Sequence, residues 1–92
     1  MSQMKKEIIY FTATWCGPCQ KIKPIFKELS EEYKDHIDFQ MIDVDEHGKM
    51  ADEYKVSGIP AFFFKVDDEV VASFSGFKPE KLREEVQSLF NF

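Results

Sequence analysis

The two cysteines of the chain, Cys16 and Cys19, are separated only by Gly17 and Pro18, in the stretch TWCGPCQ. On a helix, positions i and i+3 lie on one face, and their Cα atoms fall within the roughly 4.4–6.8 Å that a disulfide needs. Such a pair can alternate between a dithiol and a disulfide, or it can supply part of a metal site.

The two thiols are expected to differ in exposure. Cys16 should stand at the start of a helix, where unpaired N–H groups and the helix dipole favour a thiolate, and Cys19 one turn further in. An exposed nucleophile followed by a shielded resolving thiol suits two-step thiol–disulfide exchange. Gly17 lets a partner's backbone come close, and Pro18 fits the first helical turn without removing a needed donor.

Two other uses of the cysteine pair fit the sequence less well. A purely structural disulfide would stabilise the fold little, because so short a loop hardly constrains the unfolded chain. Zinc takes four ligands, and His36 and His47 have no close spacing to each other or to the cysteines. The spacing favours redox chemistry over metal binding, and we expect no metal ligands.

Strands and helices that position the pair follow from hydrophobic periodicity. Predicted strands cover residues 7–13, 37–44, 61–66 and 70–75, and predicted helices cover 16–34, 46–55 and a last segment opening at Pro79. The last two strands form a hairpin through Asp67-Asp68-Glu69. A strand–helix–strand crossover implies parallel pairing. The order β-α-β-α-β-β-α predicts one α/β domain over residues 1–92, with a mixed four-stranded sheet between helices.

Apolar side chains recur on one face of each long predicted helix. In the first helix the face contains Cys19, Ile22, Phe26, Leu29 and Tyr33, and in the last it contains Leu82, Val86, Leu89 and Phe90. Spacings of three and four residues are typical of amphipathic helices packed on a sheet.

Composition narrows the classes of function. The 92 residues suffice for one compact domain, and the net charge is −5, from 12 basic and 17 acidic residues. The chain has no Lys/Arg cluster, which argues against binding to nucleic acids or anionic membranes. The apolar run Ile8–Phe11 is too short for a secretory signal. We therefore expect a cytoplasmic protein, where a lone cysteine pair is more often catalytic or metal-binding than structural.

The sequence WCGPC, after a strand and at the start of a helix, resembles the active-site motif of the thioredoxin family. The resemblance extends over nearly the whole chain. It includes Phe11-Thr12-Ala13-Thr14-Trp15 before the motif, Pro24 within the helix, Ile42-Asp43-Val44-Asp45, Ile59-Pro60 at a separation of 44 positions from Cys16 to Pro60, and Gly76. The resemblance implies a three-layer thioredoxin-like fold.

The resemblance also implies a function. It predicts a thiol-disulfide oxidoreductase that reduces protein disulfides, binds no cofactor and receives electrons from a thioredoxin-reductase-type donor. Pro60 should be cis and face the cysteines, so that the Ile59 backbone can pair with an extended substrate segment. The expected docking rim consists of Trp15, Ile59, Pro60, Gly76 and Phe77. Asp45 is expected to accept a hydrogen bond from the Trp15 indole.

One departure from the family lies behind the cysteines. Thioredoxins usually have a buried aspartate where this chain has Tyr10, and the lysine that often partners it is Met41 here. Because both the aspartate and the lysine are absent, no buried charge is left without a partner. Since the aspartate is thought to help deprotonate the second cysteine, either the Tyr10 hydroxyl or water takes this part, or resolution by Cys19 is slower.

A second departure concerns the N-terminus. Only six residues precede Glu7, too few for the strand and helix with which thioredoxins usually begin. Strand 37–44 should then form a sheet edge, and one sheet face should lose one of its covering helices. Open edges and apolar faces favour association, so we expect a monomer or a weak homodimer.

Two alternative functions remain. A glutaredoxin-like, glutathione-coupled reductase is disfavoured by the Gly-Pro pair in place of Pro-Tyr, and by the lack of an evident site for the glutathione carboxylates. A non-catalytic thioredoxin-fold binding module would keep its function without either cysteine.

Overall fold

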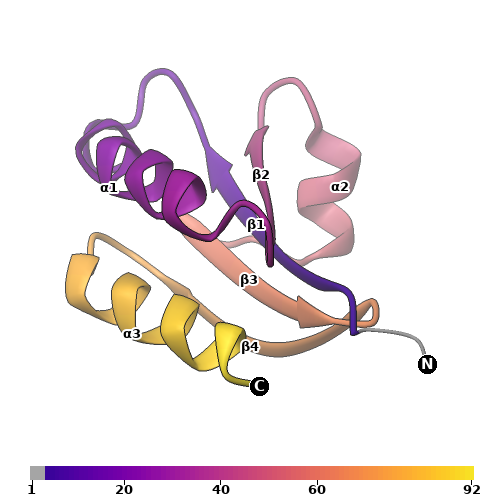
Figure 1. The fold of residues 1–92 in the computed structure, drawn as a ribbon. Helices are drawn as coiled ribbons and strands as arrows, with labels where there is room; N and C mark the ends of the chain where they lie inside the picture. The colour runs from indigo at the N-terminus through magenta and orange to yellow at the C-terminus, as the bar shows by residue number, and fades with distance from the viewer. Residues whose placement is uncertain (1–3) are drawn as a thin grey trace.

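The computed structural model describes residues 4–92 and shows four strands and three helices in them (Figure 1). The elements are β1 (Lys6–Thr12), α1 (Gly17–Tyr33), β2 (Asp38–Asp43), α2 (Gly48–Glu53), β3 (Ala61–Val66), β4 (Glu69–Ser75) and α3 (Pro79–Phe90). Their order confirms the predicted β-α-β-α-β-β-α sequence of elements.

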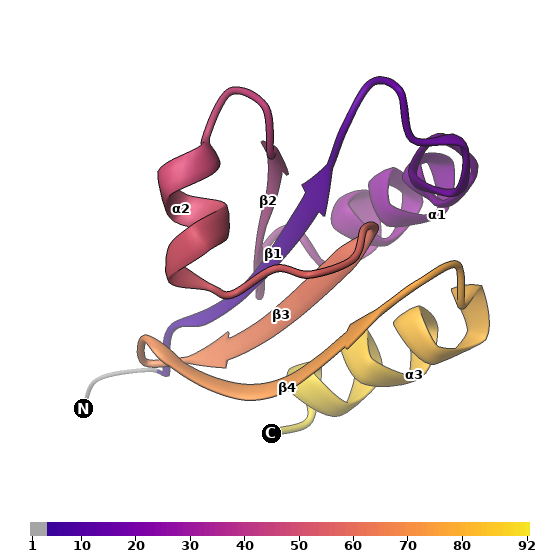
Figure 2. The same ribbon diagram turned by 180° about the vertical axis from the view of Figure 1, so that it is seen from behind.

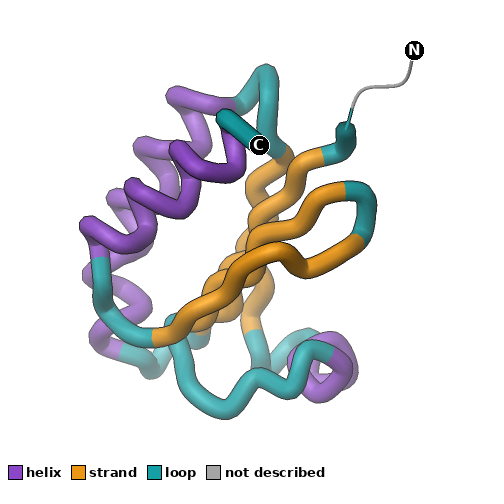
Figure 3. The backbone as a smooth tube through the Cα atoms, turned by 90° about the horizontal axis from the view of Figure 1, so that it is seen from below, coloured by secondary structure: helices purple, strands orange, loops and turns teal. Residues whose placement is uncertain are grey.

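The strands form one mixed sheet in the order β2-β1-β3-β4. β1 runs parallel to β2 and antiparallel to β3, and β3 and β4 form an antiparallel hairpin. β2 is therefore an edge strand, as predicted, and β4 is the other edge (Figures 1 and 2). α1 and α3 cover one face, and α2 lies on the other (Figure 3).

The central strand β1 is apolar on both sides because helices cover both faces of the sheet. Ile8 and Tyr10 point into the core under α1 and α3, whereas Ile9 and Phe11 join the smaller core on the α2 side. Successive side chains of a strand point to opposite faces, which accounts for this division. The buried strand fixes the point at which the chain leaves the sheet for α1.

The predicted buried faces of the helices are confirmed with one correction. Cys19, Ile22, Phe26 and Leu29 of α1 are buried, and so are Leu82, Val86 and Leu89 of α3. Phe90, assigned to the buried face, is 37% exposed. It follows Leu89 directly, so it is turned by about 100° around the helix axis. Its ring packs against Tyr33 and His36 at the end of α1.

Two boundaries differ from the sequence-based expectation for local reasons. The helix expected over 46–55 contains only Gly48–Glu53, because Glu46 and His47 donate N–H bonds to the Asp43 carbonyl in a turn. The expected three-residue hairpin loop has two residues, Asp67 and Asp68, both with positive φ. This is the conformation that favours Asp, Asn and Gly in two-residue hairpins.

Candidate active site

Cys16 and Cys19 form a disulfide, with their Cα atoms 5.2 Å apart, where the chain passes from β1 into α1. Cys16 is the N-cap of α1, with an extended backbone, and its Sγ accepts the Cys19 N–H at 3.2 Å. This donor is one of those that a helix leaves unpaired at its start, so it favours negative charge on the Cys16 sulfur. Cys16 is 6% exposed and Cys19 is fully buried, so Cys16 is the more accessible of the two but is not the exposed thiol expected from the sequence.

The segment before the disulfide is held by the Ala13 carbonyl. That carbonyl accepts the Cys16 N–H at 3.2 Å and the Gln20 side-chain amide at 2.9 Å. Gln20 thus joins the first turn of α1 to the end of β1, a role that the sequence analysis missed, although the residue follows Cys19 directly. Gly17 and Pro18 are exposed, and a Cβ added at Gly17 would meet no atom within 4 Å. The surface at Gly17, next to the disulfide in the chain, is therefore uncrowded.

The loop containing Ile59 and Pro60 lies against the disulfide. The Ile59–Pro60 peptide bond is cis, and the Ile59 carbonyl oxygen is 3.9 Å from Cys16 Sγ. Ile59 and Val44 pack on the small cluster formed by Ala13 and the two cysteines. Val44 was not singled out in the sequence, where it is one of several apolar residues near a strand end.

Gly76 and Phe77 come directly after β4, and Gly76 lies next to Pro60. Gly76 has a φ of +100°, a conformation that side chains rarely tolerate, and its N–H donates to the Pro60 carbonyl at 2.8 Å. This bond places the loop after β4 beside Pro60. Phe77, the next residue, is 47% exposed, and Trp15 is 67% exposed.

The predicted contact between Trp15 and Asp45 is confirmed. The Trp15 indole Nε1–H donates to Asp45 Oδ2 at 2.7 Å. The Asp45 backbone N–H donates in turn to Asp43 Oδ1 at 2.8 Å, which fixes the turn after β2. The carboxylate is therefore presented to the indole by the end of the neighbouring strand.

Tyr10 lies under the first turn of α1. Its side chain is fully buried, and its hydroxyl donates to the Cys19 backbone carbonyl at 2.6 Å. Burial raises the pKa of Tyr10 above its usual 10, and the nearby Thr12 hydroxyl acts more weakly in the opposite direction. The phenol consequently stays protonated at neutral pH and is no proton acceptor. Met41 stands opposite Tyr10 in the β1–β2 register.

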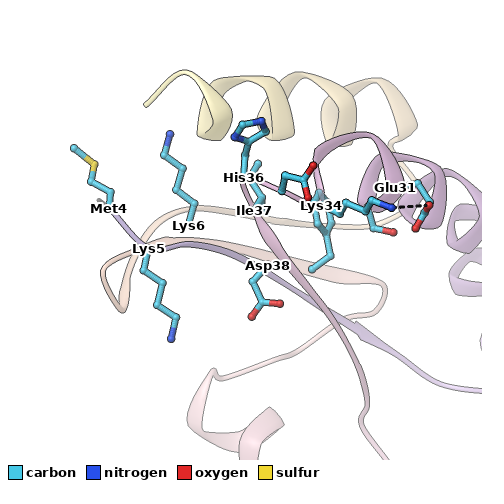
Figure 4. Close-up of a pocket in the computed structure, with 11 residues that line it drawn as sticks. Met4, Lys5, Lys6, Glu31, Lys34, His36, Ile37 and Asp38 are labelled. Carbon is cyan, nitrogen blue, oxygen red and sulfur yellow. Dashed lines mark ion pairs between the residues drawn. The ribbon is translucent and has the colours of Figure 1, made fainter. Parts of the chain in front are cut away.

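One surface hollow lies away from the disulfide. It is open, has a volume of about 490 Å³ and is lined by residues 4–6, 30–31 and 34–39, at the end of the sheet where β1 begins (Figure 4). Its lining mixes lysines and carboxylates, with Lys34 and Glu31 paired at 3.7 Å. Residues 4–92 contain no group of three or more His, Cys, Asp or Glu able to hold a metal. No helix among them is long and apolar enough to cross a membrane.

Comparison with known proteins agrees with this geometry. The family model described as Thioredoxin matches residues 1–88. Human thioredoxin is 42% identical over 85 residues, covering 92% of this chain and 80% of the human protein. Thioredoxin from Bacillus subtilis is 42% identical over 76 residues, covering 83% of this chain and 73% of its own length.

Solved structures give the same result. The germline-specific thioredoxin Deadhead from Drosophila melanogaster has a TM-score of 0.90 at 34% identity, covering 92% of this chain and 81% of that chain. A poplar thioredoxin h has a TM-score of 0.89 at 33% identity, covering 96% and 78%. With its WCGPC disulfide at the start of α1, the chain belongs to the thioredoxin family and is a thiol-disulfide oxidoreductase.

Proposed function

We propose that the protein reduces disulfides of other proteins, with Cys16 as the nucleophile and Cys19 as the resolving thiol. The observation that carries this assignment is the N-cap position of Cys16, whose sulfur receives the Cys19 N–H at 3.2 Å. A hydrogen bond to the charged form lowers a thiol pKa, whereas the full burial of Cys19 disfavours the charged form of its sulfur.

The reaction consists of two exchanges. The Cys16 thiolate attacks one sulfur of the substrate disulfide, and the other substrate sulfur leaves as a thiolate and takes up a proton. Cys19 then loses its proton and attacks Cys16 Sγ, which closes the Cys16–Cys19 disulfide and releases the second substrate thiolate. The substrate gains two electrons and the cysteine pair loses two. The disulfide seen in the structure is the product of this second step.

The surface around Cys16 suits an extended protein segment. The Ile59 carbonyl, 3.9 Å from Cys16 Sγ, can accept a backbone hydrogen bond from a substrate strand laid beside it. Trp15 and Phe77 supply exposed aromatic area. Pro60, which was expected in the docking rim, is instead fully buried, and its carbonyl accepts the Gly76 N–H. Contact through backbone and apolar rings suits substrates of varied sequence.

Renewal of the dithiol needs an electron donor. A thioredoxin-reductase-type protein returns two electrons to the Cys16–Cys19 disulfide, and the domain itself binds no cofactor. The acidic balance, −5 overall, suits protein partners in the cytoplasm better than nucleic acids or membranes. The protein acts as a monomer or as a weak homodimer.

A comparison of two electron-donor systems tests this function. Insulin reduction is followed with either thioredoxin reductase or glutathione with its reductase as the donor system. The proposal predicts turnover with thioredoxin reductase and little with glutathione. Turnover with glutathione alone would instead support a glutaredoxin-like enzyme. A variant with both cysteines replaced by serine should be inactive; retained biological function in that variant would support a binding module.

A further inference from the structure

The backbone of Cys19 is anchored on both sides of its Cα atom. Its N–H donates to Cys16 Sγ at 3.2 Å, and its carbonyl accepts the Tyr10 hydroxyl at 2.6 Å. The two bonds belong to consecutive peptide units. One of them involves the Cys16 sulfur, whereas the other comes from a side chain of β1 and involves neither sulfur.

We propose that Tyr10 is a positioning residue for resolution: its hydroxyl holds the Cys19 backbone on β1, so that the Cys19 sulfur stays beside Cys16 in the mixed disulfide. This inference rests on the proposed two-step function. In the mixed disulfide, Cys16 is bonded to the substrate and no longer to Cys19. Cys19 is then kept in place only by packing and by its backbone bonds, so the Tyr10 contact matters most at this step.

The tyrosine is itself fixed. Its ring stacks on Phe62 at 4.9 Å between centroids, with 12° between the planes, and it meets Phe26 at 4.8 Å in a tilted arrangement. Tyr10 and Phe62 are fully buried, and Phe26 is 3% exposed. A ring packed in this way cannot follow a moving carbonyl, so the hydroxyl is a stationary anchor.

The anchor acts through geometry and not through proton transfer. The hydroxyl proton is donated to a carbonyl, and the phenol stays protonated at neutral pH because burial disfavours its charged form. Loss of the hydroxyl should therefore lower the rate of resolution without moving the midpoint of its pH profile. A group that accepted the Cys19 proton would change that midpoint when removed.

The test is Tyr10→Phe, which removes the hydroxyl and keeps the ring. Tyr33→Phe is the matched control, since it removes a phenolic hydroxyl from the far end of α1. A peptide disulfide is mixed with reduced protein, and acid-quenched samples are analysed for the mixed disulfide as it forms and decays. We expect formation within about twofold of the parent and decay about fivefold slower in Tyr10→Phe, the effect of one neutral hydrogen bond. Tyr33→Phe should match the parent in both.

Each result is informative. If the parent forms no mixed disulfide through Cys16, the proposed function fails. If the mixed disulfide forms but Tyr10→Phe resolves it as fast as the parent, or with a shifted pH midpoint, the positioning role is wrong. If the variant folds poorly, the hydrogen bond to the Cys19 carbonyl is tested in the parent protein instead. Infrared spectra are recorded with ¹³C-labelled cysteine carbonyls. A Cys19 carbonyl band at the frequency of an ordinary helix carbonyl, in the reduced protein, would overturn the proposal.

Discussion

Trp15 and Asp45, which are 30 positions apart in the chain, are joined by a 2.7 Å hydrogen bond from the indole Nε1–H to Oδ2. The bond fixes a side chain that is 67% exposed beside the reactive disulfide. An exposed aromatic ring held in one orientation loses less conformational entropy when a substrate covers it. Asp45 therefore prepares the docking rim by holding the Trp15 ring in one orientation.

Asp45→Ala should raise KM for a protein disulfide about threefold to tenfold, with kcat little changed, because it frees the indole. Asp45→Asn keeps an acceptor oxygen and should stay close to the parent. Trp15 is the only tryptophan, so its fluorescence anisotropy reports the freed ring directly. Unchanged KM and anisotropy in Asp45→Ala would contradict this role. Equal effects of Asp45→Ala and Asp45→Asn would show that the negative charge of Asp45, and not the hydrogen bond, is responsible.

Tyr10→Asp should destabilise the fold by about 3 kcal/mol, because it buries an acid without a basic partner. Met41 lies directly opposite in the parallel register, so Met41→Lys in the same chain should recover much of the loss. Urea unfolding of the single and double variants measures both effects. A double variant no more stable than Tyr10→Asp would show that the two positions do not couple.

The same substitution tests how Cys19 loses its proton. An aspartate at position 10 offers a base but lacks the anchoring hydroxyl, so Tyr10→Asp should resolve mixed disulfides faster than Tyr10→Phe near neutral pH. Tyr10→Phe is the control, since it lacks both the base and the hydroxyl. If folded Tyr10→Asp protein resolves no faster than Tyr10→Phe, Cys19 is deprotonated by another route, with water or Asp45 as the next candidates.

Stability at alkaline pH should also depend on Tyr10. The raised pKa means that, above pH 10, unfolded chains release the Tyr10 proton while folded chains keep it. This contribution to stability is fully present below pH 10 and is lost as pH rises through the folded-state pKa. Between pH 9 and 11 the free energy of unfolding should therefore fall more steeply for the parent than for Tyr10→Phe. Equal slopes in denaturant titrations would show that this phenol ionises alike in both states.

Much of the fold could be predicted because its signals are local. The run Ile8–Phe11 is apolar at every position, and the i, i+3, i+4 spacing in α1 fixes which face is buried. The spacing of Cys16 and Cys19 allowed a disulfide, and the resemblance to a known family favoured it over part of a metal site. The Trp15–Asp45 contact could not be predicted from local patterns, because the two residues are distant in the chain. Only the resemblance to a known family predicted it.

Contacts that depend on packing could not be predicted. Nothing in the sequence directs the Tyr10 hydroxyl to a backbone carbonyl of α1, because this requires the distance between helix and sheet. Glu7 gives another example: it is 6% exposed, and its Oε2 accepts from the Gln40 amide at 3.1 Å on the neighbouring strand. A charged residue at the start of a strand is usually exposed, so tertiary pairing overrides the local signal here.

The β2 edge should support weak association that its acidic ends limit. Antiparallel pairing of β2 with its copy about the strand centre places Asp38 opposite Asp43 of the second copy, and like charges so placed repel. Asp38→Asn with Asp43→Asn should strengthen dimerisation, measured by sedimentation equilibrium. Asp52→Asn is the control, since it removes one negative charge from α2, away from the β2 edge. A strict monomer at millimolar concentration for parent and double variant would refute an associating edge.

The most direct test of the two-cysteine mechanism is to trap its intermediate. Each single serine variant is incubated with a disulfide-containing protein, quenched with an alkylating reagent, and analysed by non-reducing electrophoresis and mass spectrometry. Cys19→Ser should accumulate a mixed disulfide through Cys16, because the buried thiol that would resolve it is gone. Cys16→Ser should form none. Equal trapping by both variants, or trapping only through Cys19, would contradict the assignment of Cys16 as nucleophile.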